Sequence, residues 1–342
     1  MINWNFLQEL CSIPGVSGEE KGVRDRIFCE LQPFEDVSLH ITPLGCLAAK
    51  KKGKQRAAVS VLLCAPMDEP GFLVSRICDD GTVKLTPVGS ISGQALCGRP
   101  VTVCTADGEL PGVLGAKPVH LLTAEERGKP VPAGDLYLDI GALNKEEAGR
   151  AVCPGDRVVF ASPWNLSADM AFGRSLASRA ACAALAALLS RDLDFDLTAA
   201  FTAQGETGGG GLMTVVHDIH PDVVICVKGV KASLPDEEDG GCMLGKGPSV
   251  HFMDSRMIYD SRLFRGVLET ARRLGIPCQE RTAVNGNGSA GRAAAQTGAR
   301  TLALGIPVRY PGVPVSMMAK QDLESTVRLL EAVCREIAGG SF

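Results

Sequence analysis

Residues 57–70 read AAVSVLLCAPMDEP, and this stretch decides the fold. Its first eight residues are almost continuously apolar, which is typical of a strand that is buried on both faces of a parallel sheet. The apolar run ends at Ala65-Pro66-Met67-Asp68-Glu69-Pro70, where two acidic residues follow at once. We therefore expect a central strand whose carboxyl end carries polar groups.

Alternating helical and extended patterns flank this stretch on both sides. Upstream, Ser17-Gly18-Glu19-Glu20 has the pattern of a capping box, which predicts a helix from there to about Leu31. Downstream, the apolar periodicity predicts a helix over 176–190, strands over 196–204 and 222–227, a helix over 260–274, a strand over 300–307 and a closing helix over 320–338. This alternation predicts an α/β domain.

Between Gly71 and Phe160 the pattern changes to short β-like runs that are separated by turns. The runs are GFLVSRI, TVKLTPVG, RPVTVCT, GVLGA, LYLDIGA and DRVVF. Asp-Gly pairs at 80–81 and 107–108 mark two of the turns. A segment of about 90 residues with this texture is typical of a compact β-barrel. We therefore predict a discontinuous α/β domain over residues 1–69 plus 162–342, interrupted by an inserted β-barrel over 70–161.

The composition excludes several functional classes. The net charge is -4 with mixed signs, which gives no basic stripe for nucleic acid. No apolar run reaches the roughly 18 to 20 residues that a membrane span needs, and the N-terminus lacks a signal-peptide pattern. The 13 cysteines include no CxxC pair and most sit in apolar runs, so we expect reduced structural thiols. These features predict a cytoplasmic protein that binds neither nucleic acid nor a membrane.

Five polar segments occupy the places where chemistry is expected in such a fold. Ligands of open α/β sheets bind beyond the carboxyl ends of the strands. Four segments follow predicted strands and one begins a predicted helix: 66–69, 204–208, 227–229, 309–312 and 176–179. We expect these segments to meet at one site.

At this point the chain resembles a known family, the tetrahedral-assembly aminopeptidases of metallopeptidase family forty-two. The resemblance covers nearly the whole chain and rests on motifs that occur in the family's order: IPGVSGEE (13–20), PMDEPGFLVS (66–75), KPVHLLTAEERGKP (117–130), LYLDIGALNKEEA (136–148), FTAQGETG (201–208), LGKGPSV (244–250), GIPCQ (275–279) and IPVRY (306–310). The resemblance implies a zinc-peptidase-like α/β/α sandwich with an inserted β-barrel. It also implies two zinc or cobalt ions, and dimers or dodecamers that assemble through the insert.

Two site residues of the family remain in this sequence. The resemblance implies that Asp68 is the aspartate that orients a histidine ligand, and that Glu206 is a metal ligand. Arg179 also matches the family pattern, next to Ser178, and Arg309 and Tyr310 match the pair that precedes a histidine ligand. We expect these four residues to line the same pocket.

Most of the family's ligand positions are replaced. Pro66 and Gly312 stand where the family has histidine ligands, and Ala177 stands where it has the aspartate that bridges the metals. Gly205 replaces the general base, and Lys228 replaces an aspartate ligand. Upstream, the Asp and Asn of another family motif are Thr42 and Cys46.

These replacements predict that no metal cofactor of the family type is bound. A hydrolytic zinc site needs about three protein ligands, and of the five family ligands only Glu206 is retained. A lysine about 4 Å from a dication, at an effective dielectric near 20, is repelled by roughly 8 kcal/mol. We therefore interpret the chain as a non-catalytic homologue, a pseudoenzyme that binds peptides, forms homo-oligomers or assembles with active paralogues. The alternatives are an active metal-dependent aminopeptidase with an altered site, and a metal-free hydrolase on the same scaffold.

Lys228 has two interpretations. Its ammonium could replace the metal as the counter-charge and pair with Glu206, or the pocket could have collapsed with Lys228 pointing to solvent. A lysine of depressed pKa could also serve as a nucleophile or base, with Ser178 or Ser289 taking part.

Other features have simpler explanations. His217 and His220 fall in a turn between helix and strand, where surface histidines are expected, and His120 belongs to the insert. Gly208 to Gly211 lack the Lys-Ser/Thr of a phosphate loop and predict a flexible helix start. Cys46 and Cys226 are the thiols nearest to the expected site, and we expect them to pack rather than to bind metal.

Overall fold

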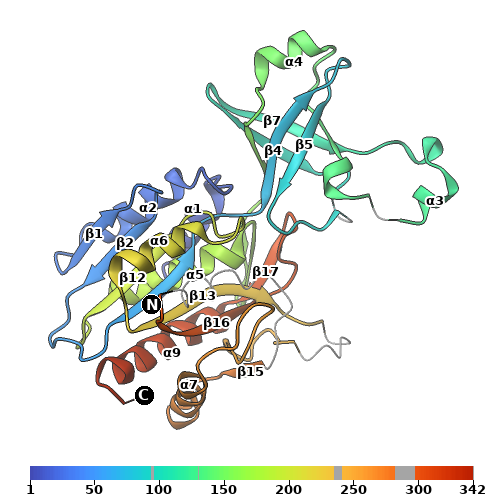
Figure 1. Ribbon diagram of the computed structural model, residues 1–342. Coiled ribbons are helices and arrows are strands. Elements are labelled where there is room, and N and C mark those ends of the chain that lie inside the picture. Colours follow the sequence, from blue (N-terminus) through green and yellow to red (C-terminus); the bar gives the residue numbers. More distant parts are fainter. Residues whose placement is uncertain (94–95, 130, 235–240, 282–296, 342) are drawn as a thin grey trace.

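The structure is a computed structural model that describes residues 1–93, 96–129, 131–234, 241–281 and 297–341 (Figure 1). It has an α/β body from which a β-barrel projects (Figure 1). The barrel is formed by strands between Gly71 and Phe160, and the chain enters and leaves it through adjacent antiparallel strands. The boundaries at 69/70 and 161/162 remain predictions.

The body is built on an eight-stranded sheet of order β1-β2-β12-β3-β13-β16-β14-β15. Its four central strands, β12-β3-β13-β16, are parallel, so their carboxyl ends meet at one edge. The strands are β1 (Val37–Ile41), β2 (Leu47–Lys51), β3 (Val61–Pro66), β12 (Leu197–Thr202), β13 (Val223–Lys231), β14 (Ser249–His251), β15 (Gln279–Arg281) and β16 (Arg300–Val308). A small antiparallel sheet adds β10 (Asn165–Leu166), β11 (Met170–Gly173) and β17 (Ser316–Ala319).

Helices cover both faces of the large sheet. The helices of the body are α1 (Trp4–Ser12), α2 (Lys21–Leu31), α5 (Leu176–Leu189), α6 (Gly210–Ile219), α7 (Ser261–Arg273) and α9 (Lys320–Ala338). On β3, Leu63 packs in the core with α5, whereas Leu62 and Cys64 pack in a second core with α6. This double burial is what the continuous apolar run predicted.

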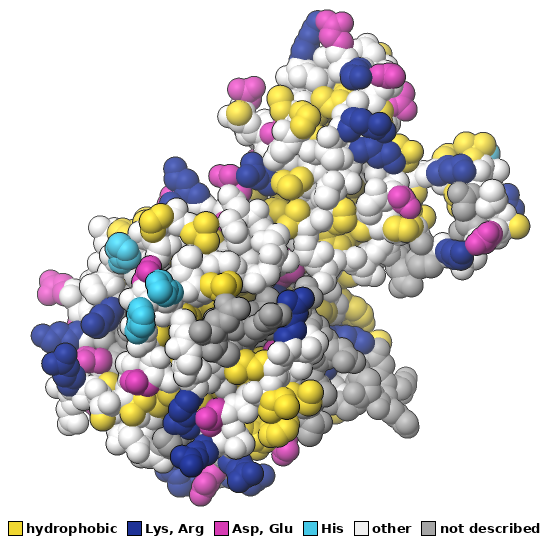
Figure 2. Space-filling view, viewed as in Figure 1, with side chains coloured by type: hydrophobic (Ala, Val, Ile, Leu, Met, Phe, Trp, Pro, Cys, Tyr) yellow, Lys and Arg dark blue, Asp and Glu magenta, His cyan; other side chains and the backbone are white. Residues whose placement is uncertain are grey.

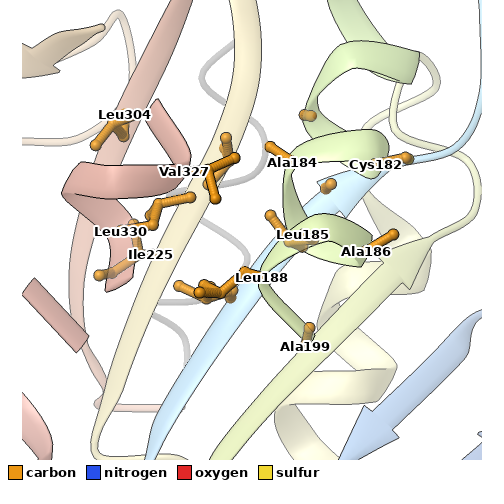
Figure 3. Close-up of a cluster of buried hydrophobic side chains, with 14 of the residues drawn as sticks. Cys182, Ala184, Leu185, Ala186, Leu188, Ala199, Ile225, Leu304, Val327 and Leu330 are labelled. Carbon is orange, nitrogen blue, oxygen red and sulfur yellow. The ribbon is translucent and has the colours of Figure 1, made fainter. Parts of the chain in front are cut away.

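Helix α5 is the centre of the larger core. Its Leu185 and Leu188 are fully buried and lie against strands β13 and β16 and helix α9 (Figure 3). Eleven of the fourteen residues of α5 are alanine or leucine, and the small alanines allow the helix to approach the sheet closely. The helix begins at Leu176, beside the carboxyl ends of the strands, so its packing fixes one wall of the expected site.

The insert forms a closed barrel of strand order β4-β5-β8-β7-β6-β9. The six predicted β-like runs correspond to β4 (Gly71–Ile77), β5 (Val83–Val88), β6 (Pro100–Thr105), β7 (Gly108–Gly115), β8 (Tyr137–Asp139) and β9 (Arg157–Phe160). The barrel core includes an edge-to-face pair between Phe72 and Phe160, with ring centroids 5.9 Å apart. Short helices lie in the connections between the last barrel strands: η2 (Val119–Leu121), α3 (Ala124–Arg127), η3 (Ala133–Asp135) and α4 (Lys145–Ala151).

Two local predictions are wrong. The capping box is not formed, because α2 begins at Lys21 with Glu20 at its N-cap, and the Ser17 hydroxyl donates to Asp68 instead. Strand β13 does not end at Val227 but continues to Lys231, because β16 pairs with it over the full length from Val223. Lys228 therefore lies within the strand and not after it.

The surface is of mixed character. On the face shown in Figure 2, Lys and Arg side chains are interspersed with Asp and Glu over both the body and the barrel. Within the described ranges, no helix has the length and apolar character that crossing a bilayer requires.

Candidate functional site

Asp68 lies at the base of the site, two residues beyond the end of β3, and is fully buried. Its Oδ2 accepts hydrogen bonds from the Ser17 hydroxyl at 2.5 Å and from the backbone N–H of Glu206 at 2.7 Å. Its Oδ1 has no hydrogen-bond partner among the described residues. Burial raises the pKa of the Asp68 carboxyl above its ordinary value of 3.8, although the two hydrogen bonds oppose this shift. Asp68 therefore fixes the backbone of Glu206, and the burial of its carboxyl group costs desolvation free energy.

Glu206, whose backbone N–H bonds to Asp68, forms an ion pair with Lys228. The Lys228 Nζ lies 2.6 Å from the Glu206 Oε1, and the side chains are 41% and 7% exposed, respectively. The structure thus brings the two charged groups together, as the ion-pair hypothesis required. Burial lowers the pKa of Lys228, but the negative charges of Glu206 and Asp68 outweigh it, so that the pKa is raised above 10.5. This direction is opposite to the one that a nucleophilic or basic lysine needs.

Two glycines at replaced positions are closely surrounded by other groups. A Cβ atom on Gly205 would lie 2.8 Å from the Asp68 Oδ1 and 2.9 Å from the Pro66 Cβ. A Cβ atom on Gly312 would lie only 2.3 Å from the carbonyl oxygen of Ser90, and Gly312 has φ +75°. Larger side chains at these positions therefore do not fit the present backbone.

The loop that follows β5 of the barrel carries both Gly89 and Ser90, and its Ser90 makes the contact with Gly312. A Cβ atom on Gly89 would lie 2.6 Å from the Glu206 Oε2, so the bare backbone of Gly89 lies directly against the carboxylate. Next to it, the Ser92 N–H donates to the Gly312 carbonyl oxygen at 3.4 Å. The insert therefore contributes part of the covering of the Lys228–Glu206 pair, which sequence reasoning did not anticipate.

Ala177 lies in the first turn of α5 and is packed against β13. A Cβ atom on Gly229 would lie 2.3 Å from the Ala177 Cα. This close approach leaves the helix start in contact with the strand that carries Lys228. Pro66, the last residue of β3, lies beside Gly205.

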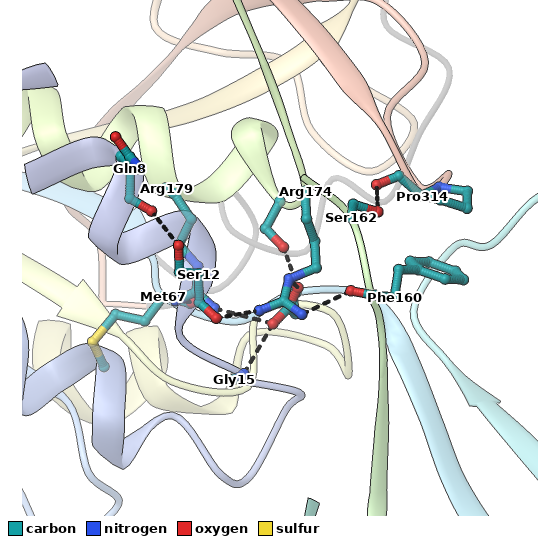
Figure 4. Close-up of polar contacts among 11 residues, drawn as sticks. Gln8, Ser12, Gly15, Met67, Phe160, Ser162, Arg174, Arg179 and Pro314 are labelled. Carbon is teal, nitrogen blue, oxygen red and sulfur yellow. Dashed lines mark hydrogen bonds and ion pairs between the residues drawn. The ribbon is translucent and has the colours of Figure 1, made fainter. Parts of the chain in front are cut away.

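Arg179 and Ser178 are buried, with exposures of 0% and 1%, and they do not line an open pocket. The Arg179 guanidinium donates to the Met67 carbonyl oxygen and lies 3.4 Å from the Glu69 Oε1 (Figure 4). Burial of Ser178 deprives its hydroxyl of the access that a nucleophile needs. The expectation of four pocket-lining residues is therefore wrong for these two.

Glu69 is the centre of a buried ionic network that sequence reasoning missed. Its carboxylate accepts from the Gly15 N–H at 2.9 Å and from the Ser175 hydroxyl, and lies 3.1 Å from the Arg174 Nε. Arg174 also donates at 2.8 Å to the carbonyl oxygens of Ser12 and Phe160 (Figure 4). The network joins α1, the end of β3 and the last barrel strand, so it fixes the wall of the site and the root of the barrel together.

Strained backbone marks the edges of the site. Ser175, Gln204 and Tyr310 have positive φ values of 61°, 58° and 56°. Ser175 precedes the site segment 176–179, whereas Gln204 and Tyr310 lie within the segments 204–208 and 309–312, and such conformations persist only where surrounding contacts enforce them. At Gln204 the contact is the Glu20 carboxylate, which accepts from the Gln204 N–H at 2.8 Å.

The remaining candidates lie elsewhere. His217 and His220 are exposed at the C-terminal end of α6, with ring centroids 5.4 Å apart, and His120 is exposed in the insert. Gly210 begins α6 as the helix-start interpretation predicted. Burial raises the pKa of the Cys226 thiol to about 12, and Cys46 accepts from the Ala203 N–H. Ser289 lies outside the described residues.

The residues at this site do not fit two divalent metal ions. Of the positions that the resemblance assigns, Asp68 and Glu206 keep a carboxylate, and Glu206 is engaged by the Lys228 ammonium. The Asp68 Oδ1, which would orient a histidine in the family, faces the Pro66–Gly205 contact. A hydrolytic zinc ion needs about three protein ligands and an open position. The donor set and the added cation both disfavour such a centre.

Comparisons with known proteins agree with the fold. The family model of the M42 glutamyl aminopeptidases matches residues 45–329. FrvX of Escherichia coli is 31% identical, with 96% of this chain and 94% of FrvX covered, and the lysyl aminopeptidase of Pyrococcus furiosus is 27% identical, with 100% and 99% covered.

Two solved structures extend this agreement to three dimensions. A TET aminopeptidase from a marine-sediment thaumarchaeon superposes with a TM-score of 0.92 at 27% identity, with 99% of each chain covered. The Pyrococcus horikoshii TET1 peptidase, which can assemble into a tetrahedron or a large octahedral shell, gives a TM-score of 0.85 at 32% identity, with 96% of this chain and 98% of that chain covered. The predicted α/β/α sandwich with a barrel insert is confirmed, and the chain belongs to the M42 glutamyl aminopeptidase family.

Proposed function

We propose that this chain is a non-hydrolytic member of the M42 family, in which the ammonium of Lys228 takes the place of the metal ions as the counter-charge of Glu206. The observation that carries the proposal is the 2.6 Å ion pair between Lys228 and Glu206. The ammonium occupies the carboxylate that a metal would need, and it repels any dication placed beside it. The chain then keeps the architecture of an aminopeptidase without its chemistry.

The shape of the site supports the proposal independently of its charge. The side chains of Asp68 and Pro66 crowd the Cβ position of Gly205, and the Ser90 carbonyl oxygen crowds that of Gly312, so a glutamate or histidine does not fit there without a shift of these groups. The packing of the Ser90 loop and of the Asp68 carboxylate therefore keeps functional side chains out of these two positions, in addition to the change of residue type. A metal-free hydrolase is disfavoured by the buried Ser178 and by the raised pKa of Lys228.

We propose binding and assembly as the remaining roles. The site segments keep strained residues at Ser175, Gln204 and Tyr310, and strain of this kind is typical of ligand-binding sites. The barrel insert is fully formed, and relatives such as the TET1 peptidase assemble into closed shells. We propose that the chain forms homo-oligomers through its insert or assembles with active paralogues, and that peptides are its ligands.

The catalytic part is tested by metal analysis and turnover. Purified protein would be analysed for zinc and cobalt by mass spectrometry and assayed with a panel of aminoacyl p-nitroanilides in the presence of each metal, with the Pyrococcus furiosus lysyl aminopeptidase as the positive control. We expect metal far below stoichiometry and no turnover. Stoichiometric metal together with turnover that Glu206→Gln abolishes would establish the alternative, an active aminopeptidase with an altered site.

The assembly part is tested by light scattering coupled to size-exclusion chromatography. We expect a particle several times the mass of the 35.9 kDa chain. A monomer at all concentrations, alone and after coexpression with an intact paralogue, would contradict the assembly role.

A further inference from the structure

A separate hollow is lined by residues that the proposed function does not use, although the sequence placed one of them, Arg309, in the main site. It is a groove of about 630 Å³, between the start of α1, the small sheet and the start of α9. Its volume is in the range of small-molecule sites. None of its lining residues belongs to the Asp68–Glu206–Lys228 cluster. The lining residues are Trp4, Ala168, Asp169, Met170, Leu244, Gly245, Arg309, Met317, Ala319, Lys320, Gln321 and Glu324.

Arg309 gives the groove an unpaired cation. Its backbone is fixed by two hydrogen bonds with Met317, of 2.9 and 3.1 Å. Its Nε is buried and has no hydrogen-bond partner among the described residues, where its guanidinium makes no ion pair either. A guanidinium that makes no ion pair with the described residues matches an incoming carboxylate with two parallel hydrogen bonds. The groove therefore offers a place for a carboxylate.

The opposite charge is also present. Asp169 and Glu324 line the groove, are exposed, and make no side-chain hydrogen bond or ion pair with any described residue. The other cation, Lys320, is already engaged: its Nζ donates to the carbonyl oxygens of Ser167 and Ala168 and lies 5.3 Å from the Trp4 ring centre. The described lining thus holds one free cation and two free carboxylates.

The rest of the wall is apolar. Trp4, Leu244, Met170 and Met317 supply a flat ring and flexible side chains, which bind aliphatic groups without demanding one shape. From this combination we infer that the groove binds a free α-amino acid with an apolar side chain. The carboxylate would lie on Arg309, the ammonium on Asp169 or Glu324, and the side chain against Trp4.

The inference can be tested with Trp4 as the reporter. The chain has two tryptophans, so a Trp164→Phe background leaves Trp4 as the sole source of tryptophan fluorescence. Titration with L-leucine is expected to change the Trp4 emission with saturation in the millimolar range or below. L-Leucinamide, which lacks the carboxylate, and N-acetyl-L-leucine, which lacks the ammonium, are expected to bind at least about tenfold more weakly.

Variants then locate the site. Arg309→Gln is expected to weaken L-leucine binding at least about tenfold, whereas Arg265→Gln, an exposed arginine on α7, is the matched control and should leave it unchanged. Circular dichroism of each variant checks that it is folded. The inference is overturned if folded wild-type protein shows no saturable response, if Arg309→Gln binds as tightly as the parent, or if either blocked leucine binds as tightly as leucine. The groove lining contains none of Asp68, Glu206 and Lys228, so none of these results depends on whether the chain is a peptidase.

Discussion

The ammonium of Lys228 lies 2.6 Å from a carboxylate oxygen of Glu206, at the edge of the sheet where the family resemblance implies metal ligands. Glu206 is 7% exposed, so its charge is nearly removed from water, whereas Lys228 is 41% exposed and keeps part of its hydration. The pair is thus intermediate between a surface salt bridge and a buried one. Its energetic contribution can be bracketed by these two limits.

Lys228→Met is expected to lower the free energy of unfolding by about 1–2 kcal/mol. Exposed pairs contribute up to about 1 kcal/mol and breaking a buried pair costs about 3–5 kcal/mol, and Lys228 lies between these cases. Urea unfolding measures the change. Lys50→Met, at an exposed strand lysine with no described partner, should cost less than about 0.5 kcal/mol. If the double variant Lys228→Met/Glu206→Met is as unstable as the sum of its single changes, the two residues are not coupled.

The pH dependence of stability should carry the signature of Asp68. Burial raises the pKa of this carboxyl above 3.8 in the folded state, so the folded chain binds the proton more tightly than the unfolded chain. A raised carboxyl pKa favours the folded state at low pH, and this advantage is lost as the pH rises from 3.8 through the raised pKa. Relative to Asp68→Asn, the wild-type protein should therefore lose free energy of unfolding over that window. Parallel curves for the two proteins from pH 3 to 8 would show that Asp68 titrates normally.

The contact between Gly312 and Ser90 should make Gly312→Ala strongly destabilising. The new Cβ would lie 2.3 Å from the Ser90 oxygen, in a backbone conformation with φ +75°. The conformational cost of about 1–2 kcal/mol and the overlap cost of about 1–3 kcal/mol add to about 2–5 kcal/mol. Gly98→Ala separates the two effects, because Gly98 has φ +76° with no atom near its Cβ position. Equal losses for both variants in thermal unfolding would mean that the Ser90 loop yields easily.

Sequence patterns predicted the parts of this molecule that depend on local burial. The apolar run at 57–64 identified β3, and alternation between Gly71 and Phe160 identified the barrel. The site was harder, because its contacts join residues far apart in the chain. Ser17 matched the capping-box motif in the sequence, yet its hydroxyl donates a hydrogen bond to Asp68, 51 positions away. No local pattern marks such a contact.

The positions where family ligands are replaced show the same limit, because the sequence does not reveal contacts between distant residues. Sequence comparison with the family pattern marks Gly205 and Gly312 as missing functional groups, but it does not reveal that Asp68 and Ser90 have closed around them. Arg179 was expected in the pocket because its neighbours in sequence are site residues, whereas it is turned inward to Met67 and Glu69. Side-chain direction at the start of α5 depends on tertiary packing, which a motif does not encode.

The Glu69 network should be among the least replaceable features of the fold. Glu69→Gln keeps the size of the side chain but leaves the buried guanidinium groups of Arg174 and Arg179 without a counter-charge. Such a loss costs about 3–5 kcal/mol in buried networks. Glu146→Gln breaks an exposed pair with Arg150 on α4 and should cost under about 1 kcal/mol. Similar unfolding midpoints for the two variants in guanidinium chloride would show that the network contributes little.

If Lys228 is what excludes a metal, its removal together with one restored ligand should admit a single ion. Lys228→Asp frees Glu206 and adds a carboxylate, and Pro66→His places an imidazole beside the Asp68 Oδ1 that now lacks a partner. The double variant would then present three donors, the number that a zinc ion with an open position requires. We expect it to bind about one zinc per chain, and not two, because Ala177 and Gly312 still supply no ligand. Pro66→His alone keeps the Lys228–Glu206 pair and should bind no zinc by calorimetry. If that single variant binds zinc as tightly as the double variant, the lysine is not the barrier, and the loss of donors alone explains the altered site.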